Sequence, residues 1–514
     1  MFKLLNDTFI ISEVIGSNST EAILESEISI SNDMPNIEKI ISTEGKIKIN
    51  RADISNNKIN LSGDLIYNII YRSNDEETSV YSMSGKIPFN EEIQADGAKE
   101  NMEPRFSAYL DYIESELLSE REFKINAVAD LDVDIINKHS VDFISTLESN
   151  GTLQAKSKNI AYTDVVFESS EELSINDAVE ISKSADEIAN ILKKDADVYI
   201  TNIDVMNDRM LVEGICKVGF LFSENNTIAS TGYVTEEFPF THYIELKDSS
   251  EDMVREIDVV PNDLTCNVEG NYDNEQKIIS FKAAFNINSK IYGTVEKNII
   301  TDCYSTDSKL DIDSSILNLV STKKVKENTI KYENTFDIGS GSIKDIYSTD
   351  VSPKISDKNI VDNEYVIEGF LDVNLLYLNG DVNKIDRAYS SMPFTAAIEL
   401  NEADLNCDIS SDIKISKCNA YRKNNNSVNA GCEIKVTARV KESDEVCVIN
   451  SITEAGPIDH NKMPSLIFRV VQQGETIWDI AKNYNVSINY LKELNDLSSE
   501  NLVPGSKVII ARKV

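Results

Sequence analysis

The chain has 514 residues, with 50 Lys or Arg against 87 Asp or Glu, and a formal net charge of −37. This excess of negative charge argues against nucleic acid and anionic membranes as partners, because both bind through clustered Lys and Arg. At roughly 100–200 residues per domain, the length predicts three or four domains.

The first residues argue against export. Asn6 and Asp7 interrupt the apolar run that starts at Met1, well short of a signal-peptide core. No segment approaches the roughly 20 apolar residues of a membrane-spanning helix. The seven cysteines are odd in number and form no CxxC pair, which is typical of free thiols in a reducing compartment. We therefore expect a cytosolic protein without membrane insertion.

An internal repeat runs through most of the chain. Three strand-like runs start with a glycine and carry an aromatic residue eight positions on: Gly63 and Tyr71, Gly214 and Phe222, Gly369 and Tyr377. A Pro-Phe pair follows each glycine by 24 or 25 residues, at Pro88-Phe89, Pro239-Phe240 and Pro393-Phe394. The glycines are 151 and 155 residues apart, which is the size of a whole domain and too long for a solenoid unit. The sequence predicts three copies of one domain.

Isoleucines also recur upstream of each glycine, in pairs three residues apart: Ile37 and Ile40, Ile188 and Ile191, Ile343 and Ile346. Residues three apart share a face of a helix, so these pairs predict a short helix in each copy. The clearest helical stretch runs from Ser184 to Lys194.

The rest of each copy is expected to be β-rich. Runs such as Leu61 to Tyr71 and Phe123 to Ile135 combine Ile, Leu, Val and aromatic residues, and turn-forming Asn, Asp, Ser and Gly flank them. We expect a β-sandwich or small barrel with one or two short helices per copy. The glycines should allow a bend or a close approach, and the Pro-Phe pairs should start an edge segment and bury the ring.

These patterns predict five segments. The three repeat domains are assigned to residues 1–155, 156–310 and 311–455, a linker rich in Gly and Pro to 456–466, and a small fourth domain to 467–514. The fold class is mainly β, followed by a small α+β domain.

The repeats carry no visible catalytic chemistry. The three histidines, His139, His242 and His460, do not recur at matching positions, and there is no P-loop, GxSxG, HExxH or metal-ligand cluster. We therefore expect no enzyme activity, no metal and no cofactor.

The C-terminal segment has its own local signals. Gly474 supplies a tight turn after a strand, and Thr476 is a helix N-cap with Asp479 three residues later, as in a capping box. Asn485 can end that helix in the left-handed conformation, and Ser487 is the next N-cap. A second strand follows Pro504-Gly505. The expected order of elements is βααβ.

This segment resembles a LysM domain. The family pattern falls on Phe468, Val470, Gly474, Thr476, Trp478, Ile480, Ala481, Tyr484, Val486, Leu491, Asn495, Leu502, Pro504 and Gly505. The segment departs from the pattern at three positions, with Glu475 for Asp, Ile477 for Leu and Ala511 for a final Pro. Most LysM domains bind N-acetylglucosamine polymers such as peptidoglycan or chitin.

The resemblance implies a groove between two loops. One side would be formed by Gln473, Gly474, Glu475, Thr476, Ile477 and Trp478, and the other by Asn495, Asp496, Leu497 and Ser498. Three of these residues also have a purely structural interpretation: Thr476 and Asn495 as helix caps, and Trp478 as a packing residue.

Over its whole length the chain resembles clostridial spore-coat morphogenesis proteins, which join several sporulation repeats of about 150 residues to a C-terminal LysM domain. The resemblance implies a structural adaptor in the mother-cell cytoplasm at the forespore surface. Its LysM domain would bind the coat morphogenetic ATPase, stage IV sporulation protein A, and its repeats other coat proteins. The alternative is a cell-wall protein whose LysM domain binds peptidoglycan.

Overall fold

The computed structural model describes residues 3–73, 80–148, 152–206, 208–225, 230–246, 253–339, 341–405, 407–459, 464–497 and 502–511. The fold is mainly β, as expected. Six three-stranded antiparallel sheets form three repeats, and a small βααβ domain follows them.

Each repeat contributes six strands in the same order. The first has β1 (Lys3–Ser29), β2 (Ile37–Ser55), β3 (Lys58–Ser73), β4 (Val80–Gln94), β5 (Glu103–Ser119) and β6 (Glu122–Glu148). The second has β7 (Leu153–Glu180), β8 (Ile188–Met206), β9 (Arg209–Glu224), β10 (Thr231–Glu245), β11 (Val254–Gly270) and β12 (Gln276–Ser305). The third has β13 (Ser308–Asp337), β14 (Ile343–Val361), β15 (Glu364–Asn379), β16 (Lys384–Glu399), the 3-10 turn η1 (Glu402–Asp404), β17 (Asp408–Arg422) and β18 (Ser427–Pro457).

Two sheets face each other in every repeat. In the first repeat the sheets are β2-β3-β4 and β1-β6-β5, and alternate side chains of β3 and β6 fill the space between them. The second and third repeats use the equivalent sheets, β8-β9-β10 with β7-β12-β11 and β14-β15-β16 with β13-β18-β17. These facing sheets confirm the expected β-sandwich. The period-two alternation along each strand explains it, because it turns one side of each sheet towards the core.

The repeated glycines face the repeated phenylalanines across the strands. Gly63 pairs with Phe89, Gly214 with Phe240 and Gly369 with Phe394. A Cβ built on Gly63 would lie 2.6 Å from Cζ of Phe89, so only glycine leaves room for the ring. The three rings are buried, and their strands lie at sheet edges as expected. The expectation that the Pro-Phe pair starts the edge segment was wrong, because β4 already begins at Val80.

The helix predicted from the isoleucine pairs is wrong. Ile188 begins strand β8, and residues 182–187 form a turn and a short coil. The spacing of three arises from β-bulges, at which one extra residue restores the phase of the alternation. The bulges recur in all three repeats, directly after Ile37 and Ile40, after Ile188 and Ile191, and after Ile343 and Ile346.

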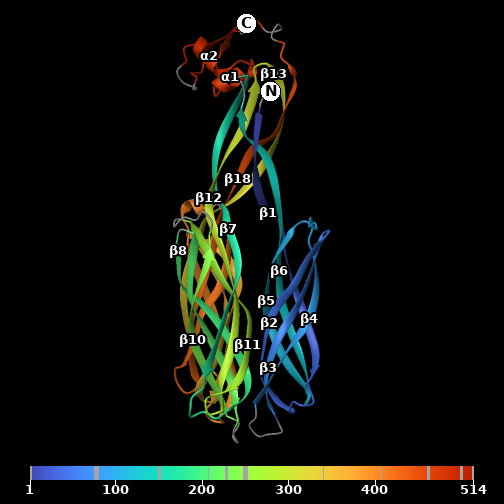
Figure 1. The fold of residues 1–514 in the computed structure, drawn as a ribbon, viewed down its shortest axis with the longest axis vertical. Coiled ribbons are helices and arrows are strands. Elements are labelled where there is room, and N and C mark those ends of the chain that lie inside the picture. Colours follow the sequence, from blue (N-terminus) through green and yellow to red (C-terminus); the bar gives the residue numbers. More distant parts are fainter. Residues whose placement is uncertain are drawn as a thin grey trace.

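The long strands continue beyond the sandwiches. Figure 1 shows the pairs β1/β6, β7/β12 and β13/β18 gathering into a narrow stem that ends at the C-terminal domain. All three repeats build the apolar interior of the stem, for example through Phe143, Ile299 and Val448. The stem is therefore a shared structure that no repeat could form alone.

The three repeats follow one another cyclically about a quasi-threefold axis. β4 lies against β8, and β16 lies against β2. Between the second and third repeats, the hydroxyl of Tyr347 on β14 donates a hydrogen bond of 3.0 Å to the carbonyl of Thr231 on β10. Ile70, Leu221 and Leu376, which occupy equivalent positions, pack in one apolar cluster at this axis.

Candidate partner-binding site

The C-terminal domain is built from β19 (Leu466–Val470), α1 (Ile477–Asn483), α2 (Ile488–Leu494) and β20 (Lys507–Ala511). The strands pair antiparallel, and the helices cover the side of the sheet that carries Val508 and Ile510. Ile480, Ala481 and Leu491 are fully buried in this small core. The expected βααβ order is confirmed.

The helix caps have the geometry expected from the sequence. The Thr476 hydroxyl accepts a hydrogen bond of 3.2 Å from the amide of Asp479, and the Thr476 amide donates one of 2.9 Å to Oδ2 of Asp479. These bonds from Thr476 lower the pKa of the Asp479 carboxyl. The Ser487 hydroxyl accepts from the amide of Tyr490, and Asn485 ends the first helix with φ 52°. With so small a core, these caps give the domain much of its definition.

The two predicted loops meet the same end of the sheet. Val470, the last residue of β19, pairs with Lys507, the first residue of β20. The chain therefore leaves towards α1 at the same end at which it returns from α2. The left-handed conformation of Gly474, with φ 81°, makes the turn into the first helix. This arrangement agrees with a groove that has one loop on each side.

The predicted groove residues differ in how available their side chains are. Ile477 is 1% exposed and belongs to the core, and Leu497 packs against that core. Asn495 bridges the second helix and β20, since its Oδ1 accepts from the amide of Ile509 at 2.6 Å. Glu475 accepts from Arg469 at 3.0 Å. These four side chains shape the site from within.

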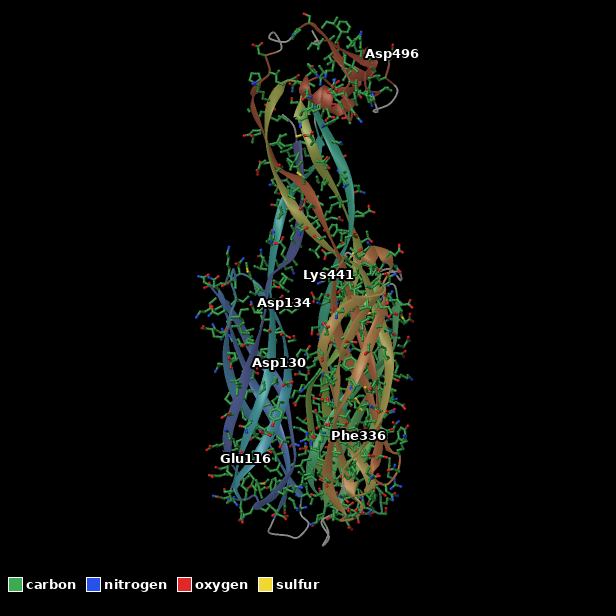
Figure 2. All side chains as sticks on the ribbon, turned by 180° about the vertical axis from the view of Figure 1, so that it is seen from behind. Glu116, Asp130, Asp134, Phe336, Lys441 and Asp496 are labelled. Carbon is green, nitrogen blue, oxygen red and sulfur yellow. The ribbon has the colours of Figure 1, made fainter. Side chains whose placement is uncertain are left out.

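Four other members of the set face outward. Gln473, Gly474, Thr476 and Asp496 are exposed, although the Thr476 hydroxyl is used in its cap. Figure 2 shows Asp496 at the end of the molecule opposite the sandwiches. Ser498 lies outside the described residues. The set as a whole stays a prediction.

Trp478 faces the repeats. Its indole Nε1 donates a hydrogen bond of 2.7 Å to Oδ2 of Asp302, and its ring meets Tyr304 edge-on at 5.1 Å. Nearby, Lys482 donates to Oδ1 of Asp302 at 2.6 Å, and the hydroxyl of Tyr304 donates to the carbonyl of Val486 at 2.8 Å. These contacts seat the first helix of the domain on the end of β12.

Asp302 and Tyr304 could not be identified from the sequence. They lie more than 170 residues before Trp478, in a different domain, and no motif marks them. Only the general preference of a buried indole N–H for an acceptor could have suggested that some partner exists.

Comparison with family models gives two matches. The model described as SipL, SPOCS domain, matches residues 36–118, 187–269 and 342–422, and the LysM domain model matches 470–511. The chain belongs to the SipL family. Each SPOCS match spans the sheet formed by the second, third and fourth strands of a repeat, together with its fifth strand. No curated protein and no solved structure matched the chain.

The SipL family assigns the chain a role in sporulation, in the morphogenesis of the spore coat, where coat proteins are its partners. SPOCS and LysM domains are both non-catalytic binding domains. Within the described residues, no helix combines the length and the apolar character needed to cross a membrane. In the same part of the chain, no three His, Cys, Asp or Glu side chains are grouped to hold a metal ion.

Proposed function

We propose that this SipL-family chain is a non-enzymatic adaptor whose LysM domain binds the coat morphogenetic ATPase, stage IV sporulation protein A. It acts in the mother-cell cytoplasm at the forespore surface, and its repeats offer further surfaces to other coat proteins. Through the repeats and the LysM domain together, several weak contacts on one chain would raise the effective concentration of coat components around the ATPase.

The observation that carries the proposal is the position of the LysM domain. It sits at the tip of the stem, held there by Asp302 and Tyr304, and its two-loop end lies away from the sandwiches (Figure 2). A partner can therefore reach Asp496 without meeting the sandwiches. None of the seven cysteines, all of which lie in the described part of the chain, forms a disulfide, which agrees with a reducing cytoplasm.

The test is a binding titration of the full chain with purified stage IV sporulation protein A and, separately, with soluble peptidoglycan fragments. We expect saturable binding of the chain to stage IV sporulation protein A. Removal of residues 465–514 should abolish it, and Gln473→Arg combined with Asp496→Lys should weaken it at least tenfold. Asn489→Lys, at an exposed position of the second helix, is the matched control and should bind normally.

Two results would replace the proposal. Binding to peptidoglycan fragments with none to the ATPase would make the chain a wall-binding protein. A fluorescent fusion without residues 465–514 that still forms a ring around the forespore would place the localisation signal outside the LysM domain.

A further inference from the structure

Three carboxylates occupy equivalent positions near the quasi-threefold axis. Glu44 on β2 pairs with Asn68, Asp195 on β8 with Gly219, and Asp350 on β14 with Asn374. In each strand the carboxylate lies four residues after the isoleucine that precedes the second bulge. The regular structure of the repeats therefore brings one acidic side chain from each repeat to the same level of the axis.

A single lysine lies among these carboxylates. Lys193 is 4% exposed, and its Nζ lies 2.8 Å from Glu44, 3.7 Å from Asp195 and 2.5 Å from Asp350. Serines stand at the equivalent positions of the other repeats, Ser42 and Ser348, which pair with Ile70 and Leu376 as Lys193 pairs with Leu221. The second repeat thus supplies the only cation of this set, and it contacts all three repeats.

The cluster borders a partly open cavity of about 910 Å³, lined by residues from every repeat. The side chains of Glu44, Asp195 and Asp350 are 30%, 32% and 47% exposed, and all three line this cavity. The hydroxyl of Ser348 also lines it and is buried without a hydrogen-bond partner. Water in the cavity would moderate the electrostatic interactions without removing them.

One ammonium does not balance three carboxylates. Burial, followed by repulsion from Asp350, raises the pKa of Glu44 despite the attraction of Lys193. Burial also raises the pKa of Asp195 to about 8, with repulsion from Asp350 and Glu44 adding to it. Burial alone would lower the pKa of Lys193. Attraction from the three carboxylates outweighs the effect of burial and raises the pKa of Lys193.

Other groups reach the cluster from the strands packed against it. They are Asp197 on β8, Tyr233 on β10 and Arg387 on β16, while Lys46 on β2 and Lys217 on β9 also line the cavity. Burial and the charge of Asp350 raise the pKa of Asp197, although Lys217 and Lys193 attract it. Within 4 Å of its ammonium, Lys193 therefore meets three carboxylates, which is an excess of negative charge in its immediate surroundings.

We propose that this cluster is a proton-dependent clasp: a proton held between Glu44 and Asp195, beside Asp350 and Lys193, keeps the three repeats closed, and its loss above neutral pH loosens them. The site lies far from the LysM domain, so the clasp does not depend on the partner of that domain. It would make the rigidity of the three-repeat body sensitive to the pH around it.

The sign of the effect follows from proton binding in the two states. Unfolded Asp195 releases its proton near 3.8, whereas the folded chain keeps it up to about pH 8. Between these values the folded state holds more protons, so stability falls as pH rises. The raised pKa of Lys193 has no effect on stability between pH 5 and pH 9. The stability that it contributes is fully present below about pH 10.4 and is lost only at higher pH.

The test compares the full chain with Asp195→Asn, a neutral side chain of nearly the same shape as the protonated acid. Urea unfolding is followed from pH 5 to pH 9, and hydrogen exchange of β2, β8 and β14 is measured at both ends of the range. We expect the unchanged chain to lose stability and exchange faster as pH rises. The variant should respond much less and should be the more stable protein at pH 9.

Asp204→Asn, at an exposed position of the same strand β8, is the control and should follow the unchanged chain. Glu44→Gln is the second variant, used if Asp195→Asn does not fold. Asp195→Asn or Glu44→Gln that is less stable than the unchanged chain at every pH would overturn the clasp, because that carboxylate would then be a charged partner of Lys193. A stabilisation by Mg²⁺ or Ca²⁺ at pH 9 that Asp195→Asn removes would also overturn it, by showing that a metal ion neutralises the cluster.

Discussion

The indole Nε1 of Trp478 donates a 2.7 Å hydrogen bond to Asp302, across 176 residues of sequence. The other carboxylate oxygen of Asp302 accepts from Lys482 at 2.6 Å. One side chain of the second repeat therefore receives two bonds from the first helix of the LysM domain. This makes the LysM domain part of the folded body and limits its freedom to swing on its connecting segment.

Replacement of Asp302 by Ala should release this contact. Trp478 is the only tryptophan of the chain, so its emission reports the contact directly. We expect emission at longer wavelength and a loss of about 1.5–3 kcal/mol in the stability of the docked domain, since hydrogen bonds to a charged group contribute in this range. Asp313→Ala, at an exposed position of the stem, should change neither quantity. Unchanged emission in Asp302→Ala would mean that the contact does not form in solution.

Thr476→Ala should weaken the LysM domain by about 1 kcal/mol, because it removes an N-cap. Thr476→Ser keeps the hydroxyl and should restore most of the loss, as measured by thermal unfolding followed through Trp478. The pKa of Asp479 is lowered in the folded domain, so the cap contributes above pH 3.8 and its contribution disappears as pH falls through the folded pKa. The difference between Thr476→Ala and the unchanged chain should therefore narrow in acid. A constant difference would exclude Asp479 from the cap.

Gly214→Ala should destabilise the second repeat by about 1–3 kcal/mol, the cost typical of overpacking. The added methyl would lie 2.5 Å from Cζ of Phe240 and 2.5 Å from the carbonyl oxygen of Tyr199. Phe240→Leu in the same chain should recover part of the loss by removing the ring, whereas the carbonyl clash remains. Gly16→Ala is the control, since its methyl would meet no atom closer than 3.8 Å. Equal urea midpoints for the two alanine variants would contradict this account.

Lys193→Met should be more damaging than the loss of a surface lysine. It keeps most of the unbranched apolar stem but leaves Glu44, Asp195 and Asp350 without their shared ammonium. Breaking a buried ion pair costs about 3–5 kcal/mol, and water in the adjoining cavity should hold the loss to the lower part of this range. The loss should grow with pH in urea unfolding. Lys358→Met, at an exposed position of β14, should cost little, and a similar cost for both variants would show that the carboxylates do not need Lys193.

The sequence was most informative where a local rule leaves a direct mark. The threefold repeat was visible because a glycine and its Pro-Phe pair recur, and the structure shows that each glycine makes room for the phenylalanine opposite it. The βααβ order followed from turn and cap residues. The helix expected at Ser184 to Lys194 was wrong because a bulged strand also places apolar residues three apart, and spacing alone does not distinguish the two.

The relations between domains could not be predicted. Asp302 belongs to a strand whose own repeat gives it no motif, and only the folded stem brings it to Trp478. The carboxylates at the axis are equally hidden, because Glu44, Asp195 and Asp350 look like ordinary acidic residues in an acidic chain. Their common register appears once the bulges are placed.

Joining the three repeats in one polypeptide has a consequence for stoichiometry. A symmetric trimer of single-repeat subunits would present three copies of any domain attached to the stem, and every substitution would appear three times. This chain carries one LysM domain on a body of three unlike repeats, so each body offers a single LysM docking point. Each face of the body can also change in sequence independently of the other two.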